Sequence, residues 1–255
     1  GRSRTLKEIS LTPTKQQKLM NNYITTNQAT VLKGCIRCYE KKNVSLMVAP
    51  SGVGFEYAAT AVLMKENPRL KLLYVNCIFS QGNKSLFVEV STALSNIRIS
   101  SLNYMRVDFD LLAKALWNRI LTDLKEDVLV ILDSIDALNM VGIKYLVSYL
   151  TNYKSMVSSK RPAKCGILVR ITPKHLSRIK AKNEPVYEAL LRICDDTKRL
   201  NTYSASEIKS FLIGLGLTDE ALISDISQRH RLIRKVVTIV ANYKKLIAEQ
   251  LKEGS

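Results

Sequence analysis

The chain has 255 residues, 46% of them hydrophobic, and carries 39 Lys and Arg against 22 Asp and Glu, a formal net charge of +17. A chain of this size can bury a sizeable core in one large domain or two modest ones. No apolar run reaches the roughly 18 residues that a membrane-spanning helix needs, so we expect no membrane partner. The excess of positive charge favours polyanions such as nucleic acid.

Residues 1–24 are polar and basic, and we predict that they form an extension. A helix is predicted over 25–42, with Thr25, Thr26 or Asn27 available to cap its first turn. Strands are then predicted at 44–49, 70–77, 128–133, 165–171 and 198–203, and helices at 56–67, 84–94, 109–124, 143–153 and 186–194. This alternation predicts an α/β domain over 25–203, with a mostly parallel sheet flanked by helices.

Beyond Tyr203 the pattern changes to helices alone. Ser204-Ala205-Ser206-Glu207 has the sequence of a capping box and opens a helix that ends near Gly214. Two more helices are predicted, one after Thr218 and one over 229–251. We therefore predict a small helical lid domain at 204–255.

The five cysteines are an odd number scattered along the chain, which argues for reduced thiols in a cytoplasmic setting. Cys35 and Cys38 have the CxxC spacing of a zinc or redox pair. No second CxxC completes a zinc site, and the only histidines are His175 and His230. Since both cysteines fall within the first helical pattern, we interpret them as packing residues, with a metal or redox pair as the alternative.

The stretch LMVAPSGVGFEYAATAVL, residues 46–63, has the order strand, glycine-containing loop, helix. A P-loop NTPase holds its triphosphate in such a loop, G-x-x-x-x-G-K-[ST], where Lys neutralises phosphate charge and the hydroxyl ligates Mg²⁺. Here Ala49 stands at the first Gly, Gly54 at the second, Phe55 at the Lys and Glu56 at the Ser/Thr. Phe55 cannot balance phosphate charge, and Glu56 would place an anion beside the phosphates.

The stretch VLVILDSIDAL, residues 128–138, is an apolar strand that ends in Asp133. This is the Walker B pattern, in which the Asp holds Mg²⁺. Ser134 stands where many such ATPases carry the Glu that orients the attacking water. Either motif alone could arise by chance, but the two lie in the expected order with a strand and helices between them.

With these motifs, the sequence resembles the AAA+ superfamily of P-loop ATPases, and more narrowly the transposition regulators of the MuB and TnsC type. The resemblance covers most of residues 16–250 and rests on NQATVLKGC, VAPSGVG, VLVILDSIDAL, GILVRITP and RHRLIRKVVTIVANY. It implies a protein that assembles around DNA in an ATP-dependent ring or filament and presents that DNA to a transposase. The departures at Phe55, Glu56 and Ser134 put ATP hydrolysis in doubt.

The resemblance also implies a set of cofactor-binding positions. A polar sensor residue ends the strand after Walker B, where Thr172 stands, and an Arg early in the last lid helix reaches the nucleotide, where Arg231 or Arg234 stands. The alternative for these arginines is the solvated or DNA-facing side of an amphipathic helix. The positions are Ser51, Gly52, Val53, Gly54, Phe55, Glu56, Asp133, Thr172 and Arg234. The sequence leaves open whether they bind ATP and Mg²⁺ without efficient hydrolysis or bind no nucleotide.

Basic residues are concentrated between Lys154 and Lys182, where nine residues are basic and none is acidic. Three segments are candidates for DNA contact: the loop before the fourth strand, the loop after the second strand, and the segment 98–106. The candidate residues are Lys160, Arg161, Lys164, Asn83, Lys84, Arg98 and Arg106. Contacts to the DNA backbone would carry little sequence specificity; ordinary solvated surface is the alternative for each residue.

From these observations we predict a cytoplasmic, non-sequence-specific DNA-binding, oligomerising AAA+-like accessory protein with little or no ATP hydrolysis. Its partners would be duplex DNA, further copies of itself, and a transposase or another DNA-processing protein. Two alternatives stay open. One is an active DNA-dependent ATPase with a non-standard P-loop that recruits a Lys from elsewhere. The other is a catalytically inactive subunit of a hetero-oligomeric replication or origin complex.

Overall fold

The computed structural model describes residues 25–79, 82–95, 104–158 and 162–253. The chain divides into two compact units, which are described separately. Within the described residues, unit 1 comprises 34–49 and 67–199, and unit 2 comprises 25–33, 50–66 and 200–253. The domain boundaries predicted above, after residues 24 and 203, stay predictions, and the predicted extension 1–24 lies outside the described residues.

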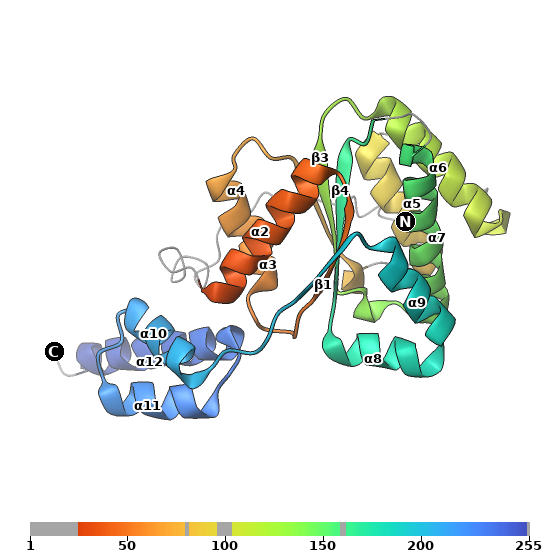
Figure 1. Cartoon of the computed structure of the whole chain (residues 1–255). Helices are drawn as coiled ribbons and strands as arrows, with labels where there is room; N and C mark the ends of the chain where they lie inside the picture. The colour runs from red at the N-terminus through yellow and green to blue at the C-terminus, as the bar shows by residue number, and fades with distance from the viewer. Residues whose placement is uncertain (1–24, 80–81, 96–103, 159–161, 254–255) are drawn as a thin grey trace. The chain divides into compact units, whose positions relative to one another are not determined.

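Unit 1 contains a five-stranded parallel sheet with the strand order β2-β3-β4-β1-β5 (Figure 1). The strands are β1 (Val44–Val48), β2 (Leu72–Asn76), β3 (Val128–Asp133), β4 (Cys165–Ile171) and β5 (Asp196–Arg199). Every residue of β1, β3 and β4 is buried, as expected for strands that are covered on both faces. The predicted α/β class with a mostly parallel sheet is therefore confirmed.

Five helices of unit 1 contribute to the apolar cluster on one face of the sheet. They are α5 (Asn83–Ser95), α6 (Phe109–Asp123), α7 (Met140–Ser158), α8 (Pro173–Lys182) and α9 (Glu184–Ile193). Short 3₁₀ turns precede α5, α6 and α7 at Cys77–Phe79, Tyr104–Arg106 and Ile135–Ala137. Their apolar side chains form one cluster with alternate residues of the strands, such as Val130 and Val169. In this cluster the Trp117 ring makes tilted contacts with Tyr149 and Tyr153, and its indole N–H donates to the Tyr149 carbonyl at 2.8 Å.

The opposite face of the sheet packs against the second half of helix α2 (Thr26–Lys41). The approach is close: a Cβ added to Gly166 of β4 would lie 2.3 Å from the Cys38 carbonyl oxygen, and one added to Gly34 would lie 2.9 Å from the Met47 methyl carbon. Glycine on both elements therefore sets how near the helix backbone can come to the sheet.

Unit 2 is helical in its C-terminal part, as predicted, with α10 (Ala205–Gly214), α11 (Glu220–Arg229) and α12 (Ile233–Glu253). The predicted capping box at Ser204 and Glu207 is confirmed, because both of its reciprocal hydrogen bonds are present. The helix that follows the glycine loop runs from Phe55 to Glu66 as α3 (Phe55–Tyr57), a π-helical turn (Ala58–Val62) and α4 (Leu63–Glu66).

Sequence reasoning missed one helix and misplaced two other elements. Helix α8 was not predicted, although Thr172 and Pro173 form a standard helix start with the Thr172 hydroxyl as the cap. The last strand lies at Asp196–Arg199 rather than at 198–203. Helix α12 begins at Ile233 rather than Arg229, since residues 230–232 are non-helical. Among the described residues, no helix is long and apolar enough to cross a membrane.

Candidate functional site

The glycine loop after β1 has backbone geometry that only glycine adopts readily. Gly52 and Gly54 have φ values of 81° and 86°, in the left-handed region. Gly54 directly precedes α3, and its carbonyl accepts the Ala58 N–H at 3.0 Å. The predicted succession of strand, glycine loop and helix is therefore present.

The side chains of this loop are not arranged for phosphate. Val53 and Phe55 are buried, with exposed fractions of 1% and 3%, so the residue at the place of the P-loop Lys belongs to the apolar core of unit 2. Ser51 and Glu56 are exposed. The loop thus offers an exposed carboxylate and no cation at the two positions where a P-loop supplies a Lys and a hydroxyl.

Backbone carbonyls of the loop are bound by other parts of unit 2. The Arg234 N–H in the first turn of α12 donates to the Gly52 carbonyl at 3.1 Å. The Tyr203 hydroxyl donates to the Val53 carbonyl at 3.0 Å and lies 2.7 Å from the Thr25 hydroxyl. These bonds hold the loop, the start of α2 and the lid helices together through the protein's own atoms.

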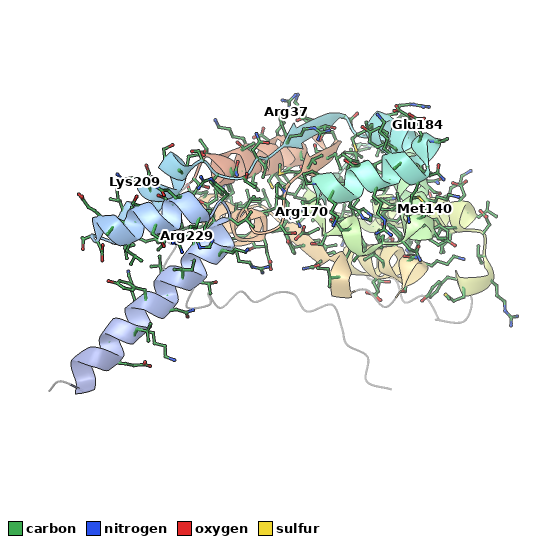
Figure 2. The ribbon with its side chains drawn as sticks, turned by 90° about the horizontal axis from the view of Figure 1, so that it is seen from below. Arg37, Met140, Arg170, Glu184, Lys209 and Arg229 are labelled. Atoms are coloured by element: carbon green, nitrogen blue, oxygen red, sulfur yellow. The ribbon has the colours of Figure 1, made fainter. Side chains whose placement is uncertain are left out.

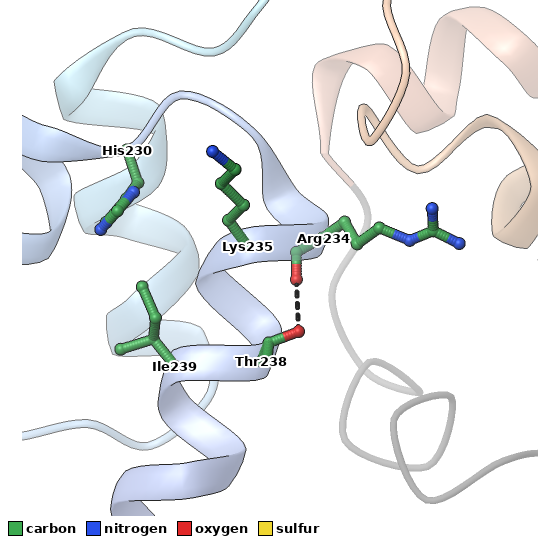
Figure 3. Close-up of a pocket in the computed structure, with 5 residues that line it drawn as sticks. All are labelled: His230, Arg234, Lys235, Thr238 and Ile239. Carbon is green, nitrogen blue, oxygen red and sulfur yellow. Dashed lines mark hydrogen bonds between the residues drawn. The ribbon is translucent and has the colours of Figure 1, made fainter.

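Arg234 was predicted to reach a nucleotide through its side chain. In the structure it contacts the loop through its backbone N–H, and its stem borders a pocket of about 370 Å³ lined by His230, Arg234, Lys235, Thr238 and Ile239. Figure 3 shows the Arg234 guanidinium pointing away from His230, Lys235 and Ile239. The other candidate, Arg231, donates to the carbonyls of Ser227 and His230.

Asp133, at the end of β3 in unit 1, is paired with an arginine. Its Oδ1 accepts the Arg170 Nη1 at 3.1 Å, and the side chains of both residues are less than a tenth exposed. The other oxygen, Oδ2, accepts the Tyr74 hydroxyl. Arg170, which is labelled in Figure 2, also donates to the Ser134 hydroxyl at 3.3 Å and to the Ala49 carbonyl at 3.1 Å.

These contacts decide whether Asp133 can hold Mg²⁺ as a Walker B residue does. Both carboxylate oxygens accept hydrogen bonds from protein groups, and a guanidinium already neutralises the charge. A divalent ion would meet Arg170 at close range, where like-charge repulsion in a buried setting is large. The residues present do not fit a Mg²⁺ ion at Asp133, and they assign this carboxylate to an ion pair.

Thr172, the predicted sensor residue, is also engaged within unit 1. Its hydroxyl donates to Asp136 and accepts the His175 N–H at 3.3 Å as the cap of α8. Burial, partly offset by Asp136, lowers the pKa of His175, so that the imidazole is neutral at physiological pH. The structure therefore brings Asp133 and Thr172 to the same ends of adjacent strands, each with protein partners.

The residues predicted to contact DNA differ in their surroundings in the structure. Arg98, Lys160 and Arg161 lie outside the described residues. The Lys84 ammonium donates to the carbonyls of Met105 and Val107 at 3.2 and 2.5 Å, and the Asn83 amide donates to Asn139 at 2.8 Å. Arg106 is exposed and Lys164 is half-buried. Of these candidates, Lys84 is bound to the backbone, and Arg106 is the one cation classed as exposed among those that the structure describes.

The basic run 154–182 separates into two groups in the structure. Lys154 pairs with Asp195 at 2.7 Å, and Arg170 is buried. The second group lies on α8, where Lys174, Arg178, Lys180 and Lys182 are exposed while Leu176 and Ile179 face the core. Lys174, Arg178 and Lys182 follow one another at four-residue spacing, which places them on one side of the helix. We call these three residues the α8 stripe.

Sequence reasoning included the α8 stripe in the charge run but not among the candidate sites. The signal that could have found it is the pairing of a Thr-Pro helix start with apolar residues at 176 and 179. Together these imply an amphipathic helix on which every charged residue is basic. Figure 2 views the molecule from the side on which α8 lies in Figure 1.

Cys35 and Cys38 are fully buried in α2, which supports their interpretation as packing residues. Burial raises the pKa of the Cys38 thiol to about 12 and raises that of Cys35 further, so both are protonated at neutral pH. Within the described part of the chain, no cluster of three or more His, Cys, Asp or Glu side chains could hold a metal ion.

No protein-family model and no curated protein sequence matches this chain. Solved structures do match. The ORC2 protein of Aeropyrum pernix in its ADPNP–ADP complexes aligns with a TM-score of 0.58 at 13% identity, over 91% of this chain and 66% of that chain. CDC6P from Pyrobaculum aerophilum aligns with a TM-score of 0.57 at 15% identity, over 99% of this chain and 65% of that chain. This chain thus spans about two thirds of the length of each.

At identities this low the likeness concerns the fold alone. Together with the parallel sheet and the strand–glycine loop–helix succession, it shows that the chain has an α/β fold of the AAA+ type. The narrower resemblance to the MuB and TnsC type stays a prediction.

Proposed function

We propose that this protein binds duplex DNA through the phosphate backbone with little sequence preference, as an oligomerising accessory protein with little or no ATP hydrolysis. The observation that carries the proposal is the α8 stripe. Lys174, Arg178 and Lys182 are exposed, α8 between Pro173 and Lys182 contains no carboxylate, and within the described residues none of the three forms an ion pair.

The spacing of the α8 stripe suits a phosphate backbone. Residues four apart rise about 6 Å along an α-helix, and each DNA strand presents a phosphate about every 3.4 Å of helix axis. Successive cations of the stripe can therefore meet different phosphates. Such contacts position a protein on the duplex but carry no direct sequence information.

The proposal is tested by titrating the protein with two duplexes of unrelated sequence at several salt concentrations. Log affinity should fall linearly with log salt, and the three contacts of the α8 stripe alone predict a slope of about −2.7, a loss of about 40-fold between about 50 and 200 mM. The two duplexes should give similar affinities and slopes, because backbone contacts are common to both. Absence of binding at about 50 mM salt, or binding to one duplex alone, would contradict the proposal.

ATP hydrolysis should not exceed the buffer background, with or without duplex DNA. The reason is that Phe55 is buried at the Lys place, Glu56 stands at the hydroxyl place and Asp133 is engaged by Arg170. Phosphate release is the measurement. Turnover that depends on the duplex and disappears in Asp133→Ala would instead identify an active ATPase with a non-standard loop.

Two biological settings are compatible with this activity. The resemblance in sequence motifs supports a transposition regulator that delivers target DNA to a transposase. The solved structures named ORC2 and CDC6P share the fold, and this supports a second candidate, a catalytically inactive subunit of an origin-type complex. Purification of the tagged protein from its host distinguishes them: co-purifying AAA+ subunits with intact Walker motifs favour the second, and a co-purifying transposase favours the first.

A further inference from the structure

We propose that the guanidinium of Arg170 takes the place of the metal cation that a Walker B carboxylate would hold. The Asp133 carboxylate at the end of β3 is thus paired with a cation of the chain itself, and this pairing excludes Mg²⁺. The inference concerns the interior of unit 1. It does not depend on DNA binding, and the outcome of its test is independent of whether the protein binds DNA.

The first argument is the set of oxygen atoms that surround Arg170. Its two terminal nitrogens donate to Asp133 Oδ1 at 3.1 Å, to the Ser134 hydroxyl at 3.3 Å and to the Ala49 carbonyl at 3.1 Å. Carboxylate, hydroxyl and carbonyl oxygens are the ligand types that Mg²⁺ and other hard cations prefer. A cation is therefore bound here by a metal-like set of oxygens, but it is covalently part of the chain.

The second argument is how the fold delivers the arginine. Strands β3 and β4 are parallel, and Leu132 pairs with Val169, so the next residues along the two strands are Asp133 and Arg170. Arg170 is the only charged residue in the buried strand Cys165–Ile171, where an uncompensated charge would be costly. The register of the sheet places the carboxylate where it compensates that charge.

The third argument is the backbone at Ser134. This residue has φ 59° and ψ 44°, a left-handed conformation that is uncommon for residues other than Gly, Asn and Asp. In this conformation its hydroxyl reaches Arg170 although Ser134 directly follows Asp133. The turn after β3 is therefore shaped around the guanidinium, at the position where an ATPase would carry its catalytic Glu.

The test uses thermal unfolding of the full chain with and without about 5 mM Mg²⁺, an excess that detects even weak binding through its effect on stability. Wild type should melt at the same temperature in both conditions. Arg170→Ala should melt about 10 °C lower, because it leaves a buried carboxylate without its partner. Mg²⁺ should raise the melting temperature of Arg170→Ala, since the three oxygens then face a vacated space.

The matched control is Arg37→Ala, which removes the exposed arginine of a long ion pair of unit 1, 3.9 Å from the partly buried Asp196, and should change the melting temperature little in either condition. A rise in the wild-type melting temperature with Mg²⁺ as large as that of Arg170→Ala would overturn the proposal. An Arg170→Ala protein that is as stable as Arg37→Ala, or that does not respond to Mg²⁺, would also overturn it.

If Arg170→Ala does not fold, the pair is tested by removing both charges. Asp133→Asn with Arg170→Met should melt within a few degrees of wild type, because replacing a buried ion pair by uncharged groups is often nearly neutral. It should also be insensitive to Mg²⁺. A double variant that is as unstable as Arg170→Met alone would show that Asp133 and Arg170 are not coupled, and the proposal would fail.

Discussion

Reversing two charges of the α8 stripe should remove most of the affinity for duplex DNA. Lys174→Glu with Arg178→Glu is expected to bind at least about 100-fold more weakly than wild type at about 50 mM salt, because two phosphate contacts are lost and two repulsions are added. The slope of log affinity against log salt should fall by roughly one unit for each contact removed. Fluorescence anisotropy with a labelled duplex measures both quantities.

The control for this experiment must carry the same net charge. Lys114 on α6 and Lys144 on α7 are exposed lysines of unit 1, and within the described residues neither forms an ion pair. Lys114→Glu with Lys144→Glu should therefore reduce affinity only by the change in long-range attraction. Equal losses in the two double variants would mean that overall charge, and not the α8 stripe, drives binding.

Among the described glycines of unit 1, replacement of Gly166 by alanine should destabilise the protein most. The new Cβ would lie 2.3 Å from the Cys38 carbonyl oxygen and 2.7 Å from its carbonyl carbon, both backbone atoms of α2. Because the obstacle is backbone, α2 must move away from the sheet. We expect a loss of about 3 kcal/mol or more in the free energy of unfolding, measured by urea denaturation.

Gly34→Ala is the matched comparison on the other side of the same contact. Its Cβ would meet the end of the flexible Met47 side chain at 2.9 Å, and this methyl group can move at small cost. Alanine also has a helix propensity about 1 kcal/mol more favourable than glycine. The free energy of unfolding should therefore change by less than about 1 kcal/mol. A Gly34→Ala variant as unstable as Gly166→Ala would contradict this account of the α2 contact.

The parts of the fold that could be predicted from the sequence are those with a strong local signal. Strands β3 and β4 lie where their apolar runs placed them, and the capping box begins α10 as predicted. Buried parallel strands are apolar along their whole length, and the capping box is a short-range motif, so neither needs information from distant residues.

The sequence-based predictions missed helix α8 and the Asp133–Arg170 ion pair. The basic residues of α8 concealed a helix that has only two buried apolar residues, Leu176 and Ile179. The ion pair depends on which strands are neighbours and in what register, and a linear reading did not supply this. A single arginine inside an apolar strand could have been matched to the aspartate that ends another, since a buried charge requires a partner.

The contacts of the glycine loop could not be predicted from residue types. The Gly52 and Val53 carbonyls accept bonds from the Arg234 backbone N–H and the Tyr203 hydroxyl. A main-chain donor has no signature in the sequence, because every residue except proline carries one. Whether the loop serves phosphate or protein is therefore decided by three-dimensional packing.

Tyr203 has a consequence for the order in which the chain folds during synthesis. Its hydroxyl contacts Thr25 and Val53, and its backbone N–H donates to the Arg231 carbonyl at 3.0 Å. Unit 2 is assembled from three stretches of chain, 25–33, 50–66 and 200–253, whereas unit 1 is complete by residue 199. As a nascent chain leaves the ribosome from its N-terminus, unit 1 can fold first, because Tyr203 and Arg234, which bind the glycine loop, are synthesised after residue 199. The loop can therefore make these contacts only after all five strands of the sheet have been synthesised.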